Sequence, residues 1–295
     1  MSPVQLRPMG IGEILDGTFS LYRKHFALFF LTALIPFAPL IPLYATVLDP
    51  AALADPDAAQ AATGTMVLLG LVSSIGTVVA MGALTHNASQ AFTGGPVSFG
   101  SGFARGLRAL FPLIGATIVI YIAVGAVGAV FAIAAPLVAA AAGDLPGAAR
   151  VLLAIAAVVL IILLFIGLLT SIFAVVPAVV VERKGPIGAL ARSWQLARGA
   201  RTRILVIFVV CWLITSLPLL GVMVALGLGT AMLDPDAAAT MTTGQLYLEQ
   251  SATILTGALT FPFFIACLVL TYYDRRIRAE GYDVQLATAA IGAAR

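Results

Sequence analysis

Residues 185–203 read GPIGALARSWQLARGARTR, a basic and amphipathic stretch that lies between two strongly apolar runs. Two earlier stretches share its outline. Aligned on an aromatic residue, the three copies are Leu190-x-x-Ser193-Trp194-x-Leu196-x-Arg198, Leu15-x-x-Thr18-Phe19-x-Leu21-x-Arg23, and Phe99-x-x-Gly102-Phe103 with Arg105 and Arg108. Because a long apolar run follows each copy at once, the pattern indicates three units, each an interfacial helix that leads into a pair of membrane-spanning helices.

The composition of the chain is typical of an integral membrane protein. Hydrophobic residues make up 61% of the 295 residues and charged residues 10%, with a mean hydropathy of +1.07. Soluble domains carry about 25% charged residues, so a soluble fold of this composition would lack polar surface. No polar linker divides the chain, and we expect one membrane domain over residues 1–295, with repeat units at about 9–92, 97–182 and 185–276.

The apolar runs predict an all-α fold with six transmembrane helices, since each run reaches the roughly 20 residues that a span requires. The predicted spans are residues 26–48, 65–92, 110–142, 148–181, 204–233 and 246–273. Pro36, Pro39 and Pro42 predict a break in the first span, because each removes a backbone donor. Residues 11–24 and 186–200 are predicted as amphipathic helices, which lie either in the headgroup plane or on the protein's own face.

Two shorter matches support the repeat. The pentapeptides Asp55-Pro56-Asp57-Ala58-Ala59 and Asp234-Pro235-Asp236-Ala237-Ala238 occupy equivalent loops. The ends of the fourth and sixth spans, at 181–184 and 273–276, also correspond.

The basic residues predict the orientation in the membrane. Of the 16 Lys and Arg residues, only Arg150 falls on the side opposite the termini. The positive-inside rule therefore places both termini in the cytoplasm. The acidic loops of the other face lack the ligand number of a calcium loop, so no metal site is expected.

The inventory of reactive side chains argues against an enzyme. His25 and His86 are the only histidines, and Cys211 and Cys267 both lie in apolar runs. No nucleophile elbow or phosphate loop occurs, so we expect no catalytic residue and no cofactor. Apart from Arg150 and Glu249, which lie near span ends, the predicted spans contain no Asp, Glu, Lys or Arg, which disfavours coupling to protons through a buried relay.

Two groups of residues are candidates for a binding role. The first is a polar cluster at the cytoplasmic span ends, made of His86, Asn87, Gln90, Glu182 and Asp274. The second is a contact with anionic membrane lipids in the third amphipathic segment, made of Arg192, Trp194, Arg198, Arg201 and Arg203. The alternative for these arginines is pairing with acids of the protein itself, namely Glu182, Asp274, Glu280 and Asp283.

Three motifs carry a resemblance to a family. They are LRPMGIGEILD at 6–16 with Tyr22 and Arg23, the stretch 181–196 that ends in ALARSWQL, and YYDRRIR at 272–278 followed by Glu280, Gly281, Tyr282 and Asp283. Together they resemble bacterial multi-span proteins labelled "glycerophosphoryl diester phosphodiesterase membrane domain", although the soluble hydrolase domain of that name is absent. The resemblance implies a multi-pass protein of the bacterial cytoplasmic (inner) membrane.

The function expected from the sequence is non-enzymatic. The chain is either a permease-like carrier of a small or amphipathic solute or a scaffold in envelope maintenance. The alternative is a membrane enzyme that acts on lipid headgroups at the cytoplasmic face. Membrane lipids, another membrane protein or a second copy of the chain are the expected partners, and nucleic acid is not.

Overall fold

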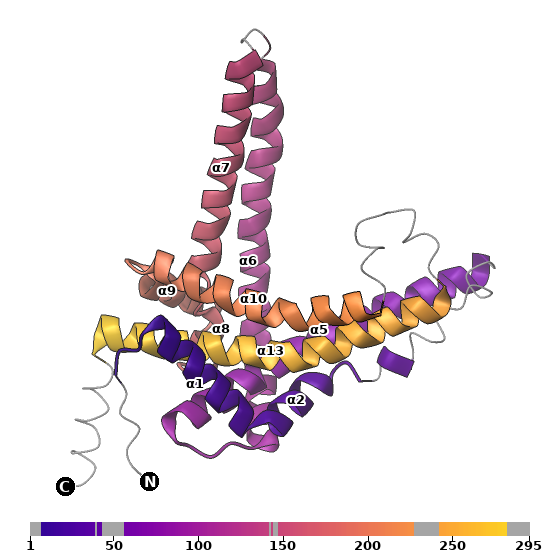
Figure 1. The fold of residues 1–295 in the computed structure, drawn as a ribbon, viewed down its shortest axis with the longest axis vertical. Coiled ribbons are helices and arrows are strands. Elements are labelled where there is room, and N and C mark those ends of the chain that lie inside the picture. Colours follow the sequence, from indigo (N-terminus) through magenta and orange to yellow (C-terminus); the bar gives the residue numbers. More distant parts are fainter. Residues whose placement is uncertain are drawn as a thin grey trace.

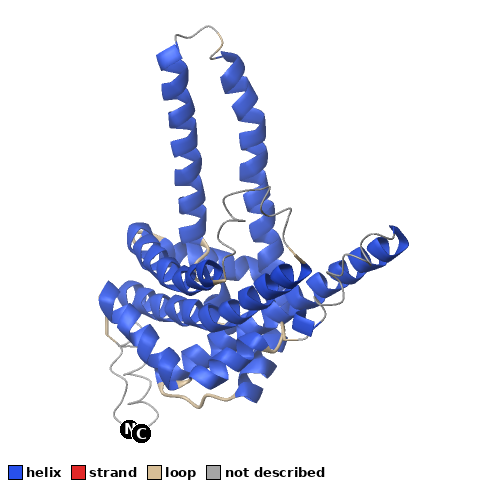
Figure 2. Cartoon of the chain, turned by 45° about the vertical axis from the view of Figure 1, so that its right-hand side comes forward, coloured by secondary structure: helices blue, strands red, loops and turns tan. Residues whose placement is uncertain are grey.

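The structure is a computed structural model, and it describes residues 7–38, 40–42, 56–141, 143, 147–226 and 242–281. This part of the chain is helical and contains no strand (Figures 1 and 2). Its helices are α1 (Ile11–Lys24), α2 (Phe26–Leu34), α5 (Pro56–Thr93), α6 (Phe99–Ala141), α7 (Gly147–Ser171), α8 (Val175–Val180), α9 (Pro186–Ala197), α10 (Arg201–Ala225) and α13 (Thr243–Glu280).

Helix α13 lies at the centre of the molecule. It packs against α1, α2, α5 and α10, and the main core forms along its second half. Ala266, Cys267 and Val269 of this half are fully buried. Cys267 and Cys211 are free thiols in this core, as the sequence indicates.

Five candidate spans meet the length and hydropathy of a membrane-crossing helix within the described residues. They are Thr63–Thr93, Phe99–Ala134, Gly147–Val180, Arg201–Ala225 and Thr243–Glu280. The first span predicted from the sequence is not among them, because α2 ends at Leu34 and turns follow at 35–38. Pro36 lies in these turns, so the predicted break is confirmed. Residues 43–55 and 227–241 lie outside the described part, and with them Asp55 and the whole second Asp-Pro-Asp loop.

The three aligned copies of the amphipathic segment share one pattern of exposure. The small residue of each copy, Thr18, Gly102 or Ser193, is buried. The aromatic residue that follows it, Phe19, Phe103 or Trp194, is exposed. The copies differ in their ends, since α1 and α9 stop before the next helix whereas α6 continues without a break from Phe99 into its apolar run. The separate interfacial helix expected for the second unit is therefore not observed.

The buried faces of α1 and α9 pack on the protein itself. On α1, Gly17 lies so close to Leu270 that a Cβ atom there would come within 2.9 Å of its side chain. Phe19 contacts Phe263 at a ring distance of 4.6 Å, and the Tyr22 hydroxyl donates to the Leu259 carbonyl at 2.6 Å. Burial raises the pKa of Tyr22 to about 12. The sequence leaves two surfaces open for these helices, the headgroup plane and the protein itself, and these contacts show that α1 packs its apolar side on the protein.

Helices α6 and α7 form a hairpin that stands steeply on α5, α10 and α13 (Figures 1 and 2). The most apolar part of α7 has no buried residue, and that of α6 has almost none. Helix α6 has 43 residues and so is about 65 Å long, well beyond a hydrocarbon core of about 30 Å. Membrane helices tilt by about 0–40°. The hairpin and the other three long helices therefore cannot all stand near the normal of one flat bilayer in this arrangement.

Candidate functional site

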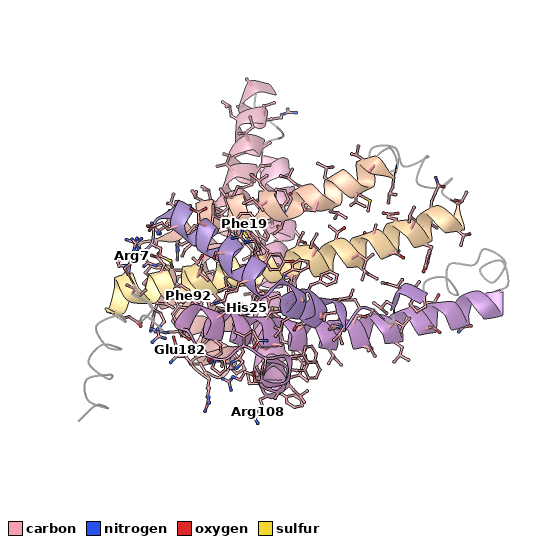
Figure 3. All side chains as sticks on the ribbon, turned by 60° about the horizontal axis from the view of Figure 1, so that its bottom comes forward. Arg7, Phe19, His25, Phe92, Arg108 and Glu182 are labelled. Atoms are coloured by element: carbon pink, nitrogen blue, oxygen red, sulfur yellow. The ribbon has the colours of Figure 1, made fainter. Side chains whose placement is uncertain are left out.

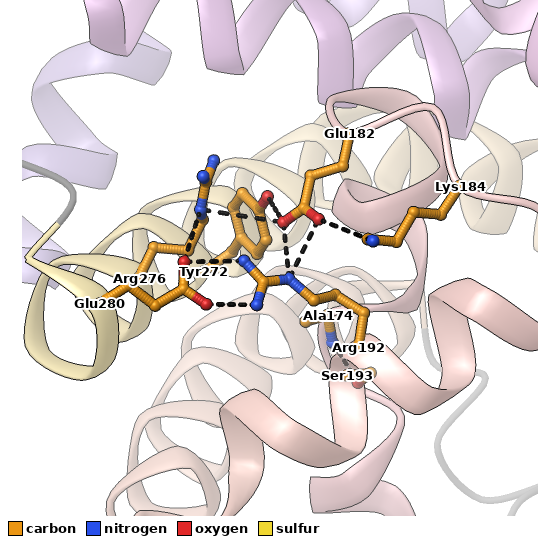
Figure 4. Close-up of polar contacts among 8 residues, drawn as sticks. All are labelled: Ala174, Glu182, Lys184, Arg192, Ser193, Tyr272, Arg276 and Glu280. Atoms are coloured by element: carbon orange, nitrogen blue, oxygen red, sulfur yellow. Dashed lines mark hydrogen bonds and ion pairs between the residues drawn. The ribbon is translucent and has the colours of Figure 1, made fainter. Parts of the chain in front are cut away.

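The last turns of α13 form an ion-pair group with α9 and the end of α8 (Figure 4). The Nε atom of Arg192 donates to both oxygens of Glu182, at 2.9 and 3.0 Å. The other edge of the same guanidinium binds Glu280, with Nη2 at 2.8 Å from Oε2 and Nη1 donating to Oε1. The Tyr272 hydroxyl donates to Glu182 at 2.6 Å, and Arg276 lies 3.4 Å from Glu280. Arg192 thus holds one carboxylate on each side.

The two carboxylates stabilise the charge of Arg192. Its hydrogen bonds to Glu280 raise its pKa above the ordinary value, burial opposes this shift, and Glu182 adds to the increase. The side chain of Arg192 is 15% exposed and those of Glu182 and Glu280 are 14% and 23% exposed. At this low exposure, an arginine that forms hydrogen bonds with two carboxylates stabilises the fold more than an exposed ion pair does.

A second group forms around Asp274, whose side chain is fully buried. Its Oδ1 atom accepts from the backbone N–H of Met9 at 2.8 Å and from Nε of Arg278 at 2.9 Å. Its Oδ2 atom lies 3.2 Å from Nη2 of Arg203. Both arginines also donate to the carbonyl of Met9, that of Arg278 at 2.8 Å. One buried carboxylate therefore joins the residues before α1, the start of α10 and the end of α13.

These pairs divide the five residues of the predicted lipid contact into two sets. Arg192 and Arg203 bind acids of the protein, which is the alternative that the sequence leaves open. Trp194, Arg198 and Arg201 are exposed, and the Arg201 guanidinium lies over the Trp194 ring at 4.8 Å from its centroid. Within the described residues, the side chains of Arg198 and Arg201 form no ion pair.

An apolar cavity of about 500 Å³ lies between α5, α6, α7, α8, α10 and α13. This volume is within the range of about 300–1,000 Å³ typical of ligand pockets. Phe208 lies in its wall, with ring distances of 6.3 Å to Phe173 and 5.7 Å to Phe264. Its hydroxyl-bearing residues are Thr117 and Thr170, and the Thr170 hydroxyl donates within its own helix, to the Ile166 carbonyl.

One face of α10 contributes to the cavity wall. Leu205, Phe208 and Trp212 line it at a spacing that places them on one side of a helix. Arg201 lies one turn before Leu205 on that same side. Trp212 is 62% exposed and Val209 is 45% exposed, so this wall is open to the surroundings of the protein. The face of α10 that lines the cavity therefore begins one turn earlier with a cation that lies over an aromatic ring.

The predicted polar cluster is divided among different contacts. Glu182 belongs to the Arg192 group and Asp274 to the Arg203 group. Asn87 is fully buried against Gly102 of α6, and Gln90 lies against Gly95 in the turn after α5. His86 is half-buried and near enough to Arg105 for their charges to interact. A 2.7 Å hydrogen bond between the hydroxyls of Ser89 and Tyr273 links α5 to the end of α13.

Sequence reasoning missed three partners in these groups. Tyr272 and the backbone of Met9 carry no signal in sequence that would place them beside Glu182 and Asp274. Arg278 has such a signal, since it lies four residues after Asp274 on the same helix face.

Residues 9–275 match the family described as a domain of unknown function, DUF7847. The chain belongs to this family. The match includes Met9, Asp274 and the cavity walls, and ends before Arg278 and Glu280. No curated protein and no solved structure matches the chain. The phosphodiesterase-associated label and a bacterial source are not part of this match, and both stay expectations.

We predict that Arg192→Ala lowers the free energy of unfolding by about 3 kcal/mol, because it leaves two carboxylates close together and without their shared cation. Arg198→Ala is the matched control, since that side chain is exposed on the same segment, and we expect a change within about 0.5 kcal/mol. Unfolding in detergent, followed by circular dichroism, measures both. Equal effects of the two substitutions would contradict the structural role of Arg192.

Proposed function

We propose that the chain binds an anionic amphiphile of the membrane, with an apolar tail in the cavity and the charged head at Arg201 and Trp194. The observation that carries the proposal is the continuous face of α10, which runs from Arg201 through Leu205 and Phe208 to Trp212. This function fits the permease-like handling of an amphipathic solute that the sequence indicates. It also fits a scaffold that senses or orders lipids in the envelope.

The tail supplies most of the expected binding free energy. Each methylene that leaves water for an apolar site contributes about 0.8 kcal/mol. An amphiphile that is already in a bilayer gains less free energy from burial of its tail in the cavity. The fit of the tail and the charge of the head group therefore decide which amphiphile binds. The Phe173, Phe208 and Phe264 rings and the exposed Trp212 favour a flexible hydrocarbon chain over a polar solute.

The head would meet three favourable groups. Arg201 carries a full positive charge, and Trp194 is a residue type that prefers the headgroup level. Arg201 is the first residue of α10, where the unpaired N–H groups of a 25-residue helix also attract an anion, and Trp194 of α9 lies under its guanidinium. An arginine near an anionic headgroup contributes roughly 1 kcal/mol.

For the topology we propose six crossings in three pseudo-repeated units, with both termini cytoplasmic in a bacterial inner membrane. The shared exposure of the aligned small and aromatic residues supports the repeat. The basic residues at the ends of the spans support the orientation. For all of these helices to cross one bilayer, the α6–α7 hairpin has to bend toward α10 from its position in the structure. The place for this bend is the base of the hairpin, where residues 172–174 separate α7 from α8.

We predict that Thr117→Phe, which fills the cavity, weakens binding of a fluorescent fatty acid and of the matching fatty alcohol alike. Ile118→Phe is the control, because the neighbouring side chain is exposed and does not line the cavity. Arg201→Gln is expected to weaken the fatty acid about fivefold and to leave the alcohol unchanged, since only the acid is charged. Fluorescence titration of the purified protein measures all of these affinities. If Thr117→Phe and Ile118→Phe behave alike, the tail does not occupy this cavity.

The topology is tested with single cysteines in a chain that lacks Cys211 and Cys267. Gly143, between α6 and α7, and Gly188, in α9, are both exposed and suit the purpose. We expect a membrane-impermeant maleimide to label Gly143→Cys in intact cells, and to label Gly188→Cys only after the membrane is opened. The reverse pattern would overturn the proposed orientation.

A further inference from the structure

Three arginines lie together where α6 begins and α8 ends, two of them on α6 and one after α8. Arg105 donates from Nε to the Val180 carbonyl at 2.8 Å and also from Nη2, which fixes the start of α6 on the end of α8. Arg183 follows Val180 by three residues, and Arg108 lies one turn after Arg105 on α6. The charges of Arg183 and Arg108 both repel that of Arg105. Arg108 and Glu182, the residue before Arg183, lie toward the same edge of the molecule in Figure 3.

Within the described part of the chain, these three arginines differ from several other arginines at the helix ends, because no acid pairs with them. Arg192, Arg203, Arg276 and Arg278 each pair with a carboxylate. Among the residues that the structure describes, Arg105, Arg108 and Arg183 form no ion pair. The nearest acid in sequence, Glu182, is already bound by Arg192 and Tyr272 and approached by Lys184 at 3.8 Å. The group therefore has a surplus of positive charge.

The backbone at Arg183 is held in an unfavourable conformation. Its φ angle of +58° is in the left-handed region, and it is the one non-glycine residue of the described chain found there. This position closes a helix, since Val181 N–H binds Pro177 and Lys184 N–H binds Ala178. Glycine is the usual residue at such a position. Because Arg183 occupies a strained turn beside two further arginines, we infer that its side chain has a functional role.

We propose that Arg105, Arg108 and Arg183 form a binding site for a phosphate group with two negative charges. Arginine forks bind phosphate through paired N–H donors, and three of them suit a dianion better than a carboxylate. Arg105 is half-buried and positioned through its Nε edge, whereas Arg108 and Arg183 are exposed and can close over a ligand. The His86 ring of α5 borders the same place. This site is separate from the amphiphile cavity and does not depend on it.

The phosphate can come from a lipid headgroup, such as phosphatidic acid, or from a soluble phosphate ester. Two arms of one experiment distinguish these sources. The first titrates purified protein in detergent with inorganic phosphate against chloride at equal ionic strength. The second measures, by native mass spectrometry, how much phosphatidic acid is retained from nanodiscs of phosphatidylcholine with a minor fraction of phosphatidic acid.

Arg183→Gly and Arg108→Gln are the test variants, and Arg23→Gln is the control because Arg23 is an exposed arginine on α1. Glycine suits the left-handed turn, so we expect Arg183→Gly to unfold at the same temperature as the wild type or higher. We expect each test variant to lose about tenfold in affinity for the bound phosphate species, and the control to lose none. Binding of inorganic phosphate indicates a soluble source, and retention of phosphatidic acid without it indicates a lipid.

The proposal is overturned if wild type and both test variants bind inorganic phosphate equally and retain equal phosphatidic acid. It is also overturned if Arg23→Gln loses as much as Arg183→Gly, because the effect would then be that of net charge. Arg183→Lys adds a further check. It keeps the charge and the strained turn but lacks the fork, so we expect its affinity to lie between those of wild type and Arg183→Gly.

Discussion

The structure depends on the neutralisation of charge at the last turns of α13. Asp274 is fully buried there and Glu280 follows six residues later on the same helix, so each needs a cation. Arg203 and Arg192 supply these cations from α10 and α9, and Met9 adds its backbone. Because the contacts join segments up to 265 residues apart in sequence, they bring both ends of the fold to one place.

This neutralisation also decides which basic residues are free for ligands. Arg192 and Arg203 are bound to acids, whereas Arg201 lies over the face of Trp194 and pairs with no acid of the described residues. Arg105 is bound to a carbonyl group, which leaves its charge uncompensated. Of the five residues proposed for a lipid contact in the third amphipathic segment, Trp194, Arg198 and Arg201 are therefore the ones left exposed for a ligand. The group around Arg105 belongs to the second amphipathic segment and is a separate proposed site.

The sequence predicts the helical class, the apolar runs and the break at Pro36, because length, hydropathy and proline chemistry act locally. It also predicts the exposed Trp194 and names Glu182, Asp274 and Glu280 as possible partners of the arginines. It does not predict the partners that each arginine takes, the cavity beside α10, or the steep hairpin. These depend on how distant helices cross, and apolar residues on all sides of a helix leave the crossing undetermined.

The most direct test of the account is a charge exchange between α9 and α13. Arg192→Glu, Glu280→Arg and the double variant are unfolded in the same detergent, and the coupling free energy is taken from the four values. We predict that the double variant regains about 2 kcal/mol relative to the sum of the single effects, since the 2.8 Å contact between these side chains can form again with reversed charges. Strictly additive losses would show that Arg192 and Glu280 do not pair, and would contradict the account.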